Sequence, residues 1–171
     1  MTEAAKLISK RAKERVEEIL EKYERLQRAR AFALEIATTE YSQSSSENYD
    51  KVGGGKTNEI HSSVEEFAVD HIDAKQDYLD ACGILSDIDT SINEELDKQH
   101  KIIIKNYVIR GFNAHQVNDR LNKLCNVVLH RSTITRKKKE SVNKLIAKEI
   151  QRHYETVCQI VETYTNDPDA T

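Results

Sequence analysis

Two long stretches of the chain repeat apolar residues at alternating intervals of three and four, the spacing that places side chains on one face of an α-helix. The first extends from Glu3 to about Thr38 and the second from Ile60 to Leu96. The single proline, Pro168, leaves almost nothing to interrupt a helix. Short β-branched runs between turn residues are scarce, which argues against a β-sandwich or β-barrel. The sequence therefore predicts an all-α protein.

The two stretches are matched in length, at about 35 residues or 50 Å of helix each. Each has one narrow apolar stripe, which needs a partner helix. Between them, residues 41–58 are rich in Ser, Gly and Asn and have no apolar period, which indicates a flexible loop. We therefore expect residues 1–98 to form a long antiparallel, coiled-coil-like hairpin, closed within one chain or between two. Its stripes are Ile8, Ala12, Val16, Ile19, Tyr23, Leu26, Ala33 and Ala37, then Ile60, Val64, Phe67, His71, Ala74, Tyr78, Ala81 or Cys82, Leu85, Ile88, Ile92 and Leu96.

The net charge of −3 conceals a strong separation of charge along the chain. Residues 59–100 carry two basic and twelve acidic side chains, whereas residues 101–152 carry thirteen basic and three acidic ones. Such asymmetry indicates an anionic partner for the basic segment. The acidic helix would be repelled by the same partner and is expected to face away from it.

A module of shorter helices is predicted over residues 99–164. Lys101–Arg110 is expected to be a helix that ends at Gly111, because glycine readily adopts the backbone conformation that follows a helix. Asn113 is expected to cap a second helix, in which Val117 and Leu121 lie four apart.

The last predicted helix is long and begins in a dense run of basic residues. Ser132 and Thr133 offer its N-cap, and its apolar series continues to about Tyr164, while residues 165–171 are expected to be a disordered tail. The apolar series from Ile146 to Tyr164 has two interpretations. It is either a dimerisation helix that follows a DNA-binding helix or a helix that packs against the protein's own hairpin.

This basic block resembles a helix-turn-helix of the sigma-factor region-four type. The larger plan, a helical hairpin with a Ser/Gly-rich loop before such a module, is similar to phage late-transcription regulators of the ArpU/RinA kind. The resemblance implies a DNA-binding transcriptional regulator in the bacterial cytoplasm that activates phage or prophage late genes, without a cofactor. The positions that match the helix-turn-helix pattern are Ile103, Tyr107, Gly111, Val117, Leu121, Ser132, Thr133, Ile134, Ser141, Val142 and Leu145.

Two features of the sequence depart from the family pattern, the length of one connection and the residue at position 118. The family usually has about four residues between the second helix and the Ser-Thr start of the third, whereas this chain has the ten residues Asn122 to Arg131. Asn118 stands where the family favours a small alanine. The connection is therefore either a long loop or a loop with an extra helical turn.

Candidate DNA contacts follow from the polar and basic side chains around the last helix. A helix start with hydroxyl and cationic side chains fits a DNA groove, where cations meet phosphates and polar groups reach base edges. The predicted base-edge residues are Thr133, Thr135, Arg136 and Lys137, and the predicted phosphate contacts are Arg120, Arg131, Lys138, Lys139 and Lys144.

Other chemistries are disfavoured by the spacing of their residues. The segment GGGKT at Gly53–Thr57 has Asp50 where a P-loop requires its first glycine. Neither Cys125-x4-His130 nor His153-x4-Cys158 has a usual zinc-ligand spacing, so no metal site is expected. No nucleophile motif or catalytic carboxylate pair is recognisable, so the chain is not expected to be an enzyme. Three separated cysteines suit a reducing cytosol, and no apolar run is long enough to span a bilayer.

The expected partners are double-stranded DNA, RNA polymerase, and a second copy bound through the hairpin or the C-terminal helix, without a membrane. Two other functions remain open at this point. A small terminase subunit that binds phage DNA for packaging also joins a helix-turn-helix to oligomerising helices. An α-helical adaptor would instead use the basic helix to bind an acidic protein without binding DNA.

Overall fold

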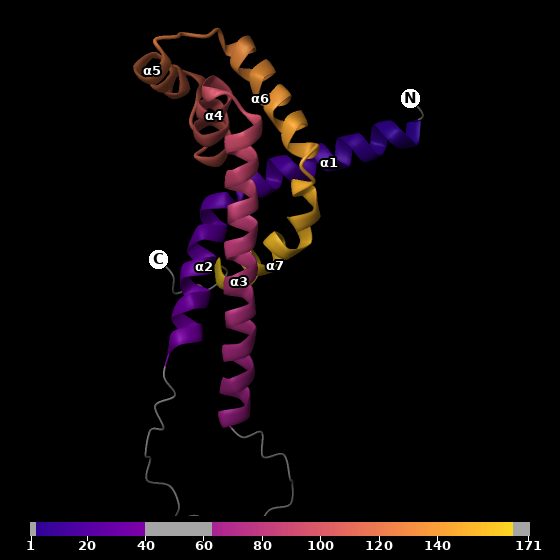
Figure 1. Cartoon of the computed structure of the whole chain (residues 1–171), viewed down its shortest axis with the longest axis vertical. Coiled ribbons are helices and arrows are strands. Elements are labelled where there is room, and N and C mark those ends of the chain that lie inside the picture. The colour runs from indigo at the N-terminus through magenta and orange to yellow at the C-terminus, as the bar shows by residue number, and fades with distance from the viewer. Residues whose placement is uncertain (1–2, 40–62, 166–171) are drawn as a thin grey trace, which may run out of the picture.

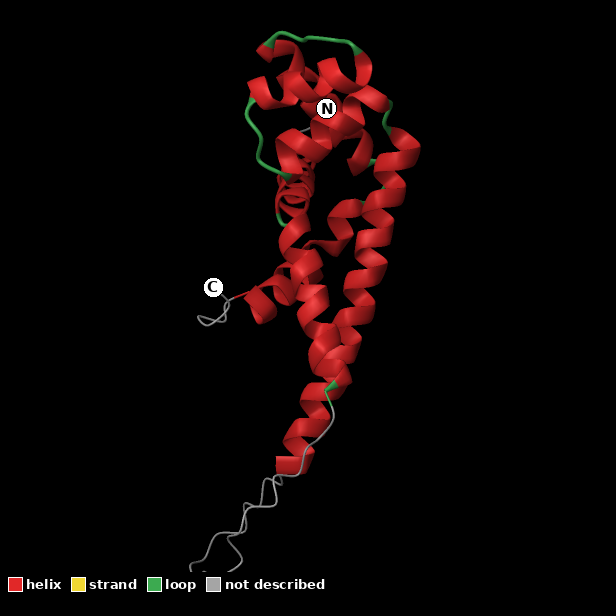
Figure 2. Cartoon of the chain, turned by 90° about the vertical axis from the view of Figure 1, so that its left-hand side faces the viewer, coloured by secondary structure: helices red, strands yellow, loops and turns green. Residues whose placement is uncertain are grey.

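The computed structural model describes residues 3–39 and 63–165, and this part of the chain is helical with short connections and no strand (Figure 1, Figure 2). The predicted all-α class is thus confirmed for these residues. None of the described helices is both long enough and apolar enough to cross a membrane. The expected loop at 41–58, with its GGGKT segment, lies outside the described residues, as do residues 166–171 of the expected tail.

The first predicted helix is divided into two, α1 (Glu3–Glu21) and α2 (Tyr23–Thr38), which run in different directions from Lys22 (Figure 1). The expectation of one continuous helix was wrong because the two halves have different partners. α1 packs across the C-terminal helices and η1, whereas α2 packs along α3. The apolar period continues through the break, but Ile8, at the far end of α1, is 69% exposed.

α2 lies antiparallel to α3 (Ser63–Glu95), and the two make the most extensive contact between helices in the described structure (Figure 1). Ala29 and Ala33 of α2 and Ala74 and Ala81 of α3 are buried, and such small side chains permit close approach of two helices. The Tyr23 hydroxyl donates a hydrogen bond of 2.8 Å to Asp89 at the upper end of this pair.

α4 (Lys98–Ile103) continues into a π-helix, η1 (Ile104–Ile109), where the sequence predicts a single short helix. The buried Asn106 side-chain nitrogen donates to the Ile102 carbonyl at 2.7 Å, and the Asn106 backbone carbonyl accepts from the Phe112 amide at 2.8 Å. Gly111 follows with a φ of +64°, as predicted for the residue that ends this helix.

The C-terminal segment forms α6 (Arg131–Ile146), η2 (Ile150–His153) and α7 (Tyr154–Thr165). The single long terminal helix that the sequence predicts is therefore wrong. The chain turns at residues 147–149, where Glu149 has a φ of +58°. The turn brings α7 back against α2, so this segment packs on the protein's own helices and does not extend as a free dimerisation helix.

Buried side chains form two clusters. The larger cluster draws on α1, α2, α3, η1, α6, η2 and α7, and so includes residues from both sides of the boundary expected near residue 98. The smaller one joins α4, α5 (Ala114–Cys125) and the first half of α6. Its buried members are Ile102, Ile103, Val117, Leu121 and Ile134. The first half of α6 is thus fixed on one face by this small core, while Arg131, Ser132 and Arg136 of the same helix are exposed.

Candidate nucleic-acid interface

The helix that precedes α6 begins at the predicted cap. The Asn113 side chain accepts hydrogen bonds of 3.0 Å from the amides of His115 and Gln116, and the Gln116 side chain accepts one of 3.0 Å from the Asn113 amide. This reciprocal capping box fixes the first turn of α5. Val117 and Leu121, which the sequence predicts on its apolar face, are fully buried.

The ten-residue connection contains both features that the sequence left open. α5 continues to Cys125, Asn126 ends it with a φ of +54°, and residues 127–130 form a short loop. The Asn118 side-chain nitrogen donates to the Leu129 carbonyl at 2.8 Å, and the Asn118 side-chain oxygen accepts from the Leu129 backbone amide at 2.9 Å. An alanine has no group for these bonds, so asparagine at this position is matched to the longer loop.

α6 begins at Arg131, two residues before the start that a Ser132 cap would give. Its N-cap is His130, whose Nδ1 accepts from the Ser132 amide at 3.3 Å and lies 2.8 Å from the Ser132 hydroxyl. The predicted cap at Ser132–Thr133 was wrong, since an imidazole nitrogen takes the acceptor role that serine usually has. Ser132 and Thr133 lie instead within the first turn of the helix.

Four of the predicted contact residues gather on one side of this first part of α6. Arg131, Arg136 and Lys139 are exposed, and Thr135 is half-buried beside them, its hydroxyl donating to the Arg131 carbonyl at 3.1 Å. With His130 and Ser132 they line one shallow surface hollow. We name this surface the basic face of α6. Arg136 lies 3.7 Å from Glu140, and both side chains are well exposed.

Lys138 lies on another side of α6, away from the basic face. Its ammonium is 3.0 Å from the Glu17 carboxylate of α1, and the two side chains are only 20% and 28% exposed. The contact attaches α6 to α1, which makes Lys138 a poor candidate for a phosphate contact.

The remaining predicted residues are distributed around the module. Thr133 and Lys137 are half-buried, and the Lys137 charge acts on Asp97 at the start of α4. Arg120 is exposed on α5, and Lys144 is exposed near the end of α6.

A buried histidine, which the sequence analysis did not identify, joins α4 to α6. His100 is only 6% exposed; its Nδ1 lies 2.7 Å from Asp97 and its Nε2 lies 3.4 Å from Glu140 of α6. Asp97 is also the N-cap of α4 and accepts a hydrogen bond of 3.0 Å from the His100 amide. The local Asp-x-x-His spacing was visible in the sequence, but the contact with Glu140 required the fold.

The stabilisation by Asp97 is expected to depend on pH. The hydrogen bond from the His100 amide, with the His100 side chain and Lys137, lowers the pKa of Asp97. A carboxylate with a lowered pKa stabilises the fold above its ordinary pKa of about 4, and this contribution is lost as the pH falls through the lowered value. Asp97→Asn keeps a capping oxygen but not the charge. We expect it to reduce the free energy of unfolding at pH 7, and the difference from wild type to vanish towards pH 2.

Urea unfolding, followed by circular dichroism at pH 7, 5, 3 and 2, measures this difference. Glu162→Gln, at an exposed position of α7, is the control for removing one negative charge. A difference between Asp97→Asn and wild type that is the same at every pH would contradict the assigned role of the charge.

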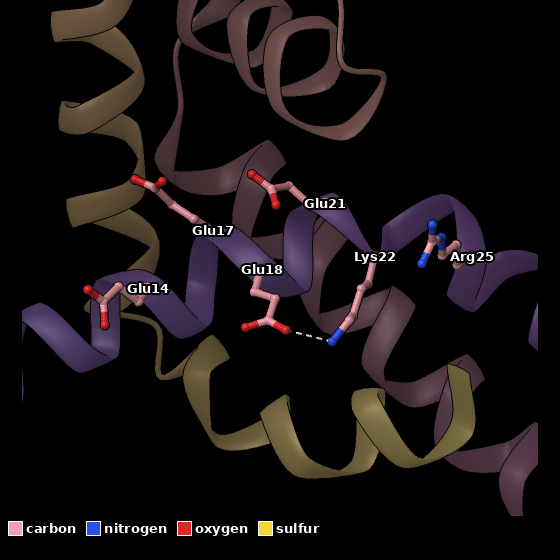
Figure 3. Close-up of a pocket in the computed structure, with 6 residues that line it drawn as sticks. All are labelled: Glu14, Glu17, Glu18, Glu21, Lys22 and Arg25. Atoms are coloured by element: carbon pink, nitrogen blue, oxygen red, sulfur yellow. Dashed lines mark hydrogen bonds and ion pairs between the residues drawn. The ribbon is translucent and has the colours of Figure 1, made fainter. Parts of the chain in front are cut away.

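The acidic hollow on α1, shown in Figure 3, is a structural junction. Glu18 accepts hydrogen bonds of 2.6 Å from Lys22 and 2.8 Å from the Tyr154 hydroxyl of α7, and both lower its pKa. The bond to Glu18 helps to raise the pKa of Tyr154 to about 12. Glu17, beside them, holds Lys138. Within residues 3–39 and 63–165, no group of His, Cys, Asp and Glu side chains is arranged to hold a metal ion.

Searches of protein-family models, curated proteins and solved structures found no match to this chain. The likeness to phage late-transcription regulators therefore stays a prediction. α5, the connection that follows it and α6 form the candidate interface.

Proposed function

We propose that the chain binds double-stranded DNA through α5 and α6, acting as a helix-turn-helix whose recognition helix is α6. The observation that carries the proposal is the basic face, on which three exposed cations gather around the first turns of one helix. Arginine and lysine bind phosphates and guanine edges, and the N-terminal residues of a recognition helix are the ones that contact bases. Arg120 on α5 is proposed as a further phosphate contact, and the half-buried Thr135 as a base contact.

The distribution of charge supports this orientation. The segment at 59–100, which includes α3, is strongly acidic and would be repelled by DNA. The main partner helix of α3 is α2, which packs along α3 at a distance from the basic face. The first turn of α6 lies at the top of Figure 1. We propose that α2 and α3 form the hairpin of the regulator, and that acidic side chains of α3 outside the outer surface described below contact RNA polymerase.

The proposed role is transcriptional control, in particular activation of phage or prophage late genes. This transcriptional role is proposed because the helix-turn-helix pattern and the order of helices in the sequence resemble those of phage late-transcription regulators. The DNA-binding part rests on the basic face and is tested separately.

Selection of bound fragments from a random pool of DNA duplexes tests the proposal. We expect one enriched motif, and an affinity for it that falls steeply with salt. Release of counterions from three or four phosphates predicts a slope of log K against log salt of roughly −3 to −4. Binding to every fragment as weakly as a generic cationic peptide would instead favour the helical adaptor and would refute DNA recognition.

A further inference from the structure

A second apolar stripe runs along α3, on the side that faces away from α2. Val69, Ile72 and Leu79 are 56%, 67% and 52% exposed. The series Val69, Ile72, Gln76, Leu79 and Gly83 advances by alternating intervals of three and four residues. This is the spacing of a seam between two helices. The space at Gly83 is open, since a Cβ added there would meet nothing within 4 Å. We name these five residues the outer stripe.

The outer stripe is bordered by carboxylates. Asp73 and Asp80 follow one edge at an interval of seven residues, and with Asp70 they line a hollow between α3 and α7. The Asp80 carboxylate accepts a hydrogen bond of 3.0 Å from Gln76. Among the described residues, no cation forms an ion pair with these three carboxylates. One edge of the outer stripe is thus negative, and the exposed Lys75 lies at the other edge.

The first half of α1 has the opposite charge and is also uncovered. Figure 1 shows this half extending away from the other helices. Leu7 and Ile8 are 53% and 69% exposed, and the exposed cations Lys10 and Arg11 follow them. An amphipathic basic helix of this kind fits an apolar surface with an acidic border.

We propose that the first half of α1 in one copy of the chain docks on the outer stripe of α3 in a second copy. The apolar residues Leu7 and Ile8 would cover the outer stripe while Lys10 and Arg11 meet its acidic border. Within one chain, α1 turns away from α2 at Lys22 and makes its main contacts with α6, η1, η2 and α7. Pairing of two α3 helices, the alternative, would bring like charges together.

Two such contacts, related by a two-fold axis, make a closed dimer. Its mass is about 39 kDa, twice the 19.6 kDa of the chain. Because opposite charges hold its borders together, its dissociation constant rises with salt concentration.

Light scattering on the full chain and on two surface variants tests the proposal. Leu7→Glu with Ile8→Glu removes the docking half of α1, and Ile72→Glu with Leu79→Glu removes the outer stripe. At about 100 µM, which is roughly 100 times a micromolar dissociation constant, the full chain is expected to be a dimer and each variant a monomer. An equimolar mixture of the two variants is expected to form a 1:1 complex, because it restores one intact contact.

The outcomes separate the possible interfaces. Self-association of the α1 variant would indicate α3–α3 pairing, self-association of the α3 variant would indicate α1–α1 pairing, and either result overturns the proposal. A full chain that is monomeric at this concentration also overturns it. Leu34→Glu, at a position on α2 that is 41% exposed, is the control and should leave the dimer intact. Circular dichroism verifies that each variant is folded, and no DNA is present, so the result is independent of the proposed function.

Discussion

Replacing Arg131, Arg136 and Lys139 together by alanine is expected to weaken binding to the selected DNA motif by at least about 100-fold. All three side chains are exposed on one face of α6, so their removal should leave the fold intact. A single good contact to a base discriminates by about 1–3 kcal/mol, and a total of about 3 kcal/mol already corresponds to a factor of roughly 100. The slope of log K against log salt should also become shallower by about 0.9 for each phosphate contact removed.

Fluorescence anisotropy with labelled duplexes measures both quantities. The matched control replaces Arg25, Arg28 and Lys105, which are exposed elsewhere, and so removes the same amount of charge. We expect this control to weaken binding only slightly. Lys138→Ala should also have little effect on affinity, because that side chain is held by Glu17. Equal losses in the α6 variant and the matched control would contradict the assignment of the basic face.

Leu145→Ala is expected to reduce the free energy of unfolding by about 2–5 kcal/mol. Leu145 has no exposed surface and belongs to the larger core, where α6 meets α1, α3 and η2. The lost contacts and the cavity that remains both contribute to this cost. This loss is a large part of the free energy of unfolding of an ordinary domain, which is about 5–15 kcal/mol.

Leu34→Ala makes the same chemical change at a position of α2 that is 41% exposed. It should alter the free energy of unfolding by no more than about 0.5 kcal/mol. Urea titrations followed by circular dichroism at 222 nm compare the two variants. If Leu145→Ala cost no more than Leu34→Ala, the second half of α6 would not be anchored in the core as described.

The helical class and much of the core could be predicted because apolar spacing is a local property of the sequence. Val16, Ile19 and Leu26 in the first stretch, and Ile88 and Ile92 in the second, are buried as the stripes require. The spacing identifies which side of a helix is covered. It does not identify the helix that covers it.

The breaks at Lys22 and Glu149 were missed for this reason. No proline or glycine occurs at either position, and the apolar period continues through both. The apolar stripe packs against one set of helices before each break and against another set after it. Contacts between segments distant in the sequence decide where that change occurs. The turn at Glu149 even uses a left-handed backbone conformation, which a glutamate rarely adopts.

The candidate site was predictable to a similar degree. The Asn113 cap and the Gly111 turn follow from local chemistry, and the structure contains both. Helical spacing places Lys138 on the face of Ile134, four residues before it, and Lys139 on another face, but it could not identify the carboxylate that pairs with Lys138. That carboxylate belongs to Glu17, which is distant in the sequence.

α6 contributes to both cores, with Ile134 in the smaller one and Val142 and Leu145 in the larger one. A continuous helix transmits rotation from one end to the other, so the tilt of the basic face depends on how α1 is seated against the second half of α6. Docking of α1 on a second copy and binding of DNA are therefore expected to be thermodynamically linked. Any such linkage is reciprocal, and DNA that strengthens the dimer must itself be bound more tightly by the dimer.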